Sequence, residues 1–113
     1  MSSLYYKEDK NMTNLTEGRQ LDNPSKLDMA KLNIACEFFS LITGVDAIVE
    51  DIWLDFGARL WYKQIVIYNR NGSFQISPNN RERILKATSD EEIEQAVRSA
   101  IERYPDLYTA RED

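Results

Sequence analysis

The chain has 113 residues, 42% of them hydrophobic, a formal net charge of −5 at pH 7, one cysteine and no histidine. A chain of this size and composition can fold around one hydrophobic core, and none of its apolar runs is long enough for a transmembrane helix. The lone Cys36 excludes an internal disulfide and should be buried and inert, and the absence of histidine removes the usual general base and metal ligand. We therefore expect a cytoplasmic protein that is not an enzyme and that holds no metal or cofactor.

The N-terminal segment differs in composition from the rest of the chain. Residues 1–22 are rich in Asn, Thr, Lys and Glu, and their apolar residues are scattered without periodicity. This composition is typical of a flexible arm. Hydrophobic periodicity begins after it. We therefore expect a flexible N-terminal arm at 1–22 and a single α+β domain at 23–113.

A first helix is expected between a cap at Asn23 and a stop at Gly44. Pro24 suits the first helical position, and Ser25 with Asp28 offers a variant of the capping box. Apolar side chains then recur at helical spacing at Leu27, Ala30, Ile34, Phe38, Phe39 and Leu41. Because further apolar residues widen this stripe, we expect the helix to be mostly buried.

Residues 47–77 are predicted to form three antiparallel strands joined by two hairpins. The first hairpin should close at Asp55–Ala58, and Asn71-Gly72 is a strong signal for the second. These turns predict a register that pairs Leu54 with Arg59, Ile52 with Trp61, Glu50 with Lys63, Ile48 with Ile65, Ile67 with Ile76 and Asn69 with Phe74.

The two faces of this predicted sheet differ in chemistry. One face is apolar and is assigned to the helices; it consists of Ile48, Ile52, Leu54, Trp61, Ile65, Ile67, Phe74 and Ile76. The other face mixes aromatic side chains with amides, which is typical of a surface that is buried only on binding. We therefore expect a protein-binding surface made of Trp53, Leu60, Tyr62, Gln64, Val66 and Tyr68. The alternative is that the first helix or the N-terminal arm covers this face.

The last helix is predicted to begin at Ser89, where Asp90-Glu91-Glu92 completes a capping box, and to stop at Pro105. Its narrow apolar face consists of Ile93, Ala96, Val97, Ala100, Ile101 and Tyr104. A short helix or turn is expected at Arg81–Ala87. The predicted fold is therefore α+β, with a three-stranded antiparallel meander, a helix before it and one or two helices after it, in α-β-β-β-α order.

These patterns favour an interaction protein. We expect a small intracellular module that self-associates, or that binds and can inhibit a larger protein partner such as one that handles nucleic acid. The alternative is a nucleic-acid-binding module that uses the basic segment 59–86, with contacts from Arg59, Arg70, Arg81, Arg83 and Lys86. An enzyme of unknown class is the second alternative. Its candidate carboxylates are Glu50, Asp51 and Asp55, but a cross-strand ion pair between Glu50 and Lys63 explains the first of these better.

Overall fold

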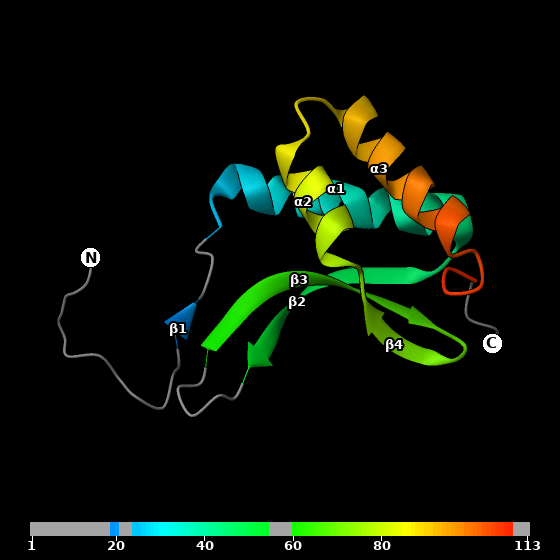
Figure 1. The fold of residues 1–113 in the computed structure, drawn as a ribbon, viewed down its shortest axis with the longest axis horizontal. Coiled ribbons are helices and arrows are strands. Elements are labelled where there is room, and N and C mark those ends of the chain that lie inside the picture. The colour runs from blue at the N-terminus through cyan, green and yellow to red at the C-terminus, as the bar shows by residue number, and fades with distance from the viewer. Residues whose placement is uncertain (1–18, 21–23, 55–59, 110–113) are drawn as a thin grey trace, which may run out of the picture. The chain divides into compact units, whose positions relative to one another are not determined.

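The computed structural model describes residues 19–20, 24–54 and 60–109. In chain order the elements are β1 (Arg19–Gln20), α1 (Lys26–Thr43), β2 (Asp46–Leu54), β3 (Leu60–Asn69), β4 (Gly72–Gln75), α2 (Pro78–Lys86) and α3 (Asp90–Arg103). Strands β2, β3 and β4 form an antiparallel meander that follows α1 and precedes the two C-terminal helices along the chain (Figure 1). The predicted α+β class and element order are therefore confirmed.

The meander gains one short strand that the sequence pattern did not reveal. β1 pairs in parallel with the start of β3, with Arg19 opposite Leu60 and Gln20 opposite Trp61. The chain divides into two compact units, Met1–Asn23 with Ile52–Tyr62, and Pro24–Asp51 with Lys63–Asp113. The rest of the expected arm and the turn at Asp55–Ala58 lie outside the described residues.

Local side-chain bonds explain where α1 begins and ends. The Ser25 hydroxyl accepts a hydrogen bond from the Asp28 amide at 3.0 Å, and the Asp28 carboxylate accepts one from the Ser25 amide at 3.3 Å. This reciprocal pair confirms the capping box but makes Ser25 the cap in place of Asn23. Gly44 ends the helix with a positive φ of 79°, as expected, and its N–H donates to the Ser40 carbonyl.

Each of the two C-terminal helices begins after a serine whose hydroxyl caps the first turn. The reciprocal bond of the capping box predicted at Ser89 is replaced by one from the Thr88 N–H to the Glu92 carboxylate at 2.8 Å. α3 begins after Ser89, whose hydroxyl accepts from the Glu92 amide at 3.2 Å, as the sequence predicted. α2 begins after Ser77, with Pro78 in its first turn, and so starts earlier than the expected Arg81. The serine–proline start was overlooked because the strand pattern was extended to Ser77.

The core lies between the helices and one face of the sheet. In the larger unit all three helices lie on the same side of the meander and pack on one another (Figure 1). The largest buried side chains there are Leu32, Phe39, Val45, Ile65, Ile67, Ile84 and Val97. Helix α1 therefore does not cover the second face of the sheet, which was one of the expected alternatives.

Helix α1 is buried along one stripe only. Leu32, Ala35, Cys36 and Phe39 face the core. Leu27 and Leu41, which the sequence assigned to the interior, are 64% and 80% exposed. The expectation of a mostly buried helix is therefore wrong at these two positions, because α1 carries apolar residues on more sides than the sheet and the other helices cover.

The segment after α3 is anchored in the core by Tyr108. Its ring stacks on Phe39 at a centroid distance of 5.1 Å and meets Phe74 edge-on at 5.6 Å. The buried Asn69 side chain donates a hydrogen bond to the Leu107 carbonyl. Tyr104 was predicted on the apolar face of the last helix but is 47% exposed. The buried tyrosine of this region is Tyr108.

The second hairpin turns one residue earlier than predicted. β3 and β4 pair Ile67 with Phe74 and Asn69 with Gly72, so the turn consists of Arg70 and Asn71. The Asn69 side chain accepts a hydrogen bond from the Asn71 amide at 2.8 Å, which stabilises this two-residue loop. The predicted register is wrong by two residues. A shift of two leaves every side chain on its predicted face.

The register between β2 and β3 differs by an odd number of residues, which reverses the faces of β2. Ala47 and Val49 pack against the core, whereas Ile48 is 49% exposed. The Lys63 ammonium contacts Asp51, not the predicted Glu50. The face assignment is therefore wrong for β2, while Ile65 and Ile67 of β3 are buried as expected. Composition could not reveal this because both faces of β2 contain apolar residues.

Candidate protein-binding site

The residues predicted to form a binding face do not form one surface. The rings of Trp53 and Trp61 contact each other at a centroid distance of 6.1 Å, so these two residues share a face of the β2–β3 pair. Leu60 and Tyr62 flank Trp61 along β3 and therefore point to the opposite face. Trp53 and Tyr62 thus do not lie side by side. Trp53 is 48% exposed, and the ring beside it belongs to Trp61, which was predicted to lie on the core face.

Gln64 and Val66 contribute little accessible surface. Gln64 is 2% exposed and Val66 is 5% exposed. The Gln64 amide oxygen accepts from the Ile65 N–H at 2.8 Å, and its amide nitrogen donates to the Ile76 carbonyl at 3.4 Å. The side chain therefore fills a gap in the backbone ladder where the chain leaves β4 for α2. A partner cannot use this amide without breaking those bonds.

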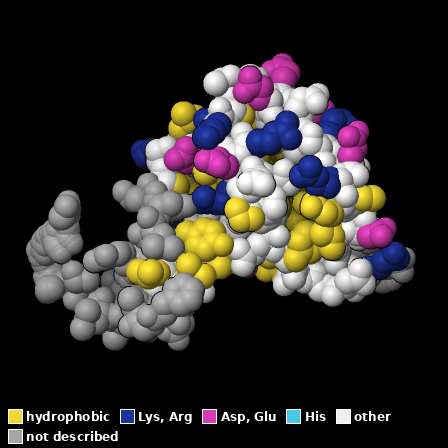
Figure 2. Space-filling model, viewed as in Figure 1, with side chains coloured by type: hydrophobic (Ala, Val, Ile, Leu, Met, Phe, Trp, Pro, Cys, Tyr) yellow, Lys and Arg dark blue, Asp and Glu magenta, His cyan; other side chains and the backbone are white. Residues whose placement is uncertain are grey.

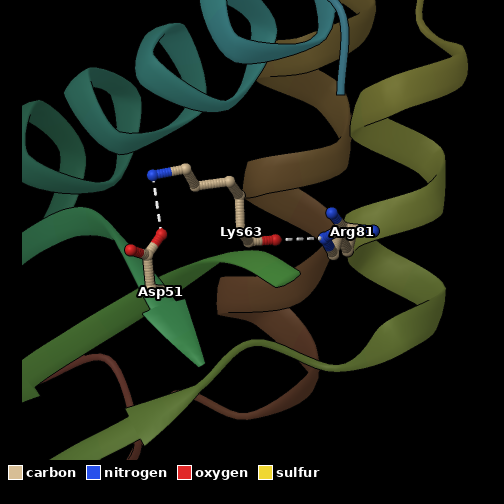
Figure 3. Close-up of polar contacts among 3 residues, drawn as sticks. All are labelled: Asp51, Lys63 and Arg81. Atoms are coloured by element: carbon tan, nitrogen blue, oxygen red, sulfur yellow. Dashed lines mark hydrogen bonds and ion pairs between the residues drawn. The ribbon is translucent and has the colours of Figure 1, made fainter. Parts of the chain in front are cut away.

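Two carboxylates of β2, those of Glu50 and Asp51, contact side chains of β3. Lys63 reaches from β3 to Asp51, with 2.6 Å between Nζ and Oδ1, while the Lys63 carbonyl accepts a hydrogen bond from Arg81 of α2 at 2.9 Å (Figure 3). On the other face the Tyr68 hydroxyl donates to the Glu50 carboxylate. The described residues contain no group of three or more Cys, Asp or Glu side chains that could hold a metal ion. The contacts of Asp51 with Lys63 and of Glu50 with Tyr68 therefore connect β2 to β3.

The basic residues of segment 59–86 are distributed among acidic ones. Lys86 lies 3.3 Å from the Glu82 carboxylate, and Arg83 lines a groove between α2 and α3 together with Glu82 and Glu92. Figure 2 shows Lys and Arg side chains interspersed with Asp and Glu over the helices on the face drawn. Arg70 is exposed at the hairpin turn, and Arg59 lies outside the described residues. The structure therefore offers no uniformly basic patch on this face.

An open groove lies between α1 and the edge of the sheet. β2 ends the strand order β1-β3-β2, so β3 is its only neighbour among the described strands. Beside it is a groove of about 820 Å³, which we call the β2–α1 groove. Two of its lining residues, Leu41 and Ile48, are among the most exposed large apolar side chains of the described chain. The lining consists of Asn33, Cys36, Glu37, Ser40, Leu41, Ala47, Ile48 and Val49.

The connection between α1 and β2 fixes the end of this groove. The Ser40 hydroxyl donates to the Val45 carbonyl at 2.9 Å, and the Thr43 hydroxyl accepts from the Val45 N–H at 3.2 Å. Val45 itself is 1% exposed, and Gly44 supplies the left-handed turn between the two elements. Helix and strand are therefore held in a defined relation, and the groove does not need to be formed by a partner.

The groove is apolar at its base and acidic at its rim. Ala47 and Val49 pack against the core, and Glu37 is the one charged side chain in the lining. Burial, with a smaller contribution from Glu37, raises the pKa of the Cys36 thiol from 9.0 to about 12. The thiol is therefore protonated at neutral pH and behaves as a small apolar group, as expected from the sequence. A groove with an apolar base and an acidic rim suits the binding of a partner protein.

Sequence reasoning missed Leu41 and Ile48 because it assigned both to the interior. For Leu41, the spacing of apolar residues in the sequence offered one sign of exposure. Leu27 and Leu41 do not belong to the stripe of Leu32, Cys36 and Phe39, so α1 carries more apolar residues than one buried face needs. No comparable signal existed for Ile48, whose exposure follows from the register of β2.

No protein-family model, curated protein sequence or solved structure matches this chain. Within the described ranges, none of the helices combines the length and the apolar character that crossing a membrane requires.

Proposed function

We propose that this chain is a small, non-enzymatic, cytoplasmic protein-interaction module that binds an extended segment of another protein beside β2. The observation that carries the proposal is the position of β2 at the edge of the sheet, with Ile48 exposed on the strand itself and Leu41 exposed on the adjacent α1. The outer edge of a strand presents backbone N–H and C=O groups to an incoming strand, and an adjacent apolar groove accepts its side chains. Binding of this kind would inhibit a partner whose active segment is the one captured.

Composition supports the other parts of the proposal. The chain contains no histidine, and Glu50 and Asp51 of β2 make cross-strand contacts, which favours a binding role over catalysis. A single, buried cysteine without a disulfide partner fits a protein of a reducing compartment. A contiguous apolar groove marks an interaction site more specifically than scattered exposed residues do.

The proposal is tested with two leucines of the same helix. Leu41 lines the groove, while Leu27 is also exposed but lies near the other end of α1 and outside the lining. Leu41→Gln should weaken partner binding by about tenfold or more, on the scale of a contact at the centre of an interface, and Leu27→Gln should leave it unchanged. Because both side chains are exposed, both variants should keep their stability within about 0.5 kcal/mol.

The measurement compares proteins captured from the native cell by the original chain and by the two variants, followed by the Kd of each purified partner. A partner lost by the Leu41 variant and retained by the Leu27 variant supports the proposal. Equal binding by all three chains contradicts it. Binding of nucleic acid that weakens steeply with salt would instead favour the basic segment as the functional site.

A further inference from the structure

We infer that the segment bound at the β2 edge is a basic peptide in which Lys or Arg alternates with apolar residues. This inference rests on the proposed strand addition, and it names the chemistry of the partner. It follows from the alternation of β2 itself. Ala47 and Val49 face the core side, whereas Asp46, Ile48 and Glu50 face the opposite side.

The core side of the β2 edge favours apolar side chains. An added strand would direct every second side chain toward the β2–α1 groove, where Leu41, Ala47 and Val49 supply apolar contacts. Leu41 is 80% exposed in the structure, so covering it removes apolar surface from water. Every second residue of the partner should therefore be apolar.

The opposite side of the β2 edge favours cations. Asp46 and Glu50 flank Ile48 on this side, and β2 contains no basic residue. Within the described part of the chain, Asp46 makes no ion pair, and Glu50 accepts only an uncharged hydroxyl donor, that of Tyr68. Opposite charges on neighbouring strands attract, so Lys or Arg at the alternate positions of the partner would face these carboxylates. The exposed Glu37 adds negative charge at the rim of the groove.

The same charges disfavour a second copy of this chain. Two antiparallel β2 strands paired around Ile48 would bring Asp46 of each copy close to Glu50 of the other. Like charges on neighbouring strands destabilise their pairing. Charge complementarity therefore favours a different, basic chain.

The test measures binding of three labelled nine-residue peptides to the full chain by fluorescence anisotropy. One peptide alternates Val with Lys, the second alternates Val with Glu, and the third has the composition of the first with its residues grouped, so that the alternation is lost. The Val/Lys peptide should bind at least about tenfold more tightly than each of the others. Asp46→Asn should weaken its binding about threefold or more, and Glu102→Gln, an exposed acid on α3, should not.

The outcomes separate the inference from the proposed function. Equal binding of the Val/Lys and Val/Glu peptides, with both lost in Leu41→Gln, would overturn the basic specificity and leave strand addition intact. Binding of the Val/Lys peptide that neither Leu41→Gln nor Asp46→Asn weakens would overturn both. A chain that sediments as a dimer which Leu41→Gln dissociates would identify a second copy as the occupant and overturn the inference.

Discussion

The ammonium nitrogen of Lys63 lies 2.6 Å from a carboxylate oxygen of Asp51, which places odd-numbered residues of β2 and β3 on the same face of the sheet. This relationship directs Val49 to the core and leaves Ile48 at the surface. One cross-strand contact thus identifies which side chains of β2 a partner strand would meet.

A double-mutant cycle tests this register. Asp51→Ala and Lys63→Ala should show a coupling energy of about 0.5 kcal/mol in urea unfolding, which is typical of a partly exposed ion pair. The corresponding cycle of Glu50→Ala with Lys63→Ala should be additive. Coupling in the Glu50 cycle and none in the Asp51 cycle would contradict the faces assigned to β2.

The Tyr108 ring should be essential for stability. It is buried and contacts both Phe39 and Phe74, so Tyr108→Ala should lower the free energy of unfolding by about 3–5 kcal/mol. Tyr104→Ala removes a half-exposed ring a few residues earlier and should cost much less. Chemical denaturation measures the free energy of unfolding of both variants. Similar losses of this free energy would mean that Tyr108 does not anchor the C-terminal segment.

The side-chain amide of Gln64 should protect the Ile65 backbone N–H from solvent. Gln64→Leu keeps the volume of the side chain but leaves the Ile65 N–H and the Ile76 carbonyl without their amide partner. We expect a loss of about 1–3 kcal/mol and faster hydrogen exchange at the Ile65 amide. The change at Ile65 is the decisive readout. Unchanged exchange there would show that the backbone closes the ladder without this side chain.

Stability should fall at alkaline pH. Burial raises the pKa of Cys36 from 9.0 to about 12 and that of Tyr108 from 10.0 to about 12. The unfolded chain loses these protons at lower pH than the folded one, so the stabilisation is present below about pH 9 and is lost as the pH rises toward 12.

The thiol contribution can be isolated with Cys36→Ala. Under reducing conditions, the free energy of unfolding of the original chain should decrease more between about pH 8 and pH 10 than that of the variant. If the free energy of unfolding decreases equally in both proteins over this pH range, the burial of the Cys36 thiol is contradicted.

The sequence predicted elements with strong local signals more accurately than it predicted the site. Ser89 and Gly44 were identified correctly as helix ends because capping is local chemistry. The positions of Leu41 and Ile48 depend on which stripe of α1 and which face of β2 the core selects. Both elements carry apolar residues on two sides, so composition supported either choice, and an odd shift in register reversed β2 completely.

Hydrogen exchange of the complex tests the central claim most directly. If an extended segment adds to β2, alternate backbone amides within Asp46–Asp51 should exchange at least about tenfold more slowly when the Val/Lys peptide is bound, because an incoming strand accepts their hydrogen bonds. The amides of α3 should keep their rates. A bound peptide that leaves the amides of Asp46–Asp51 unprotected, and protects residues elsewhere, would contradict strand addition at this edge.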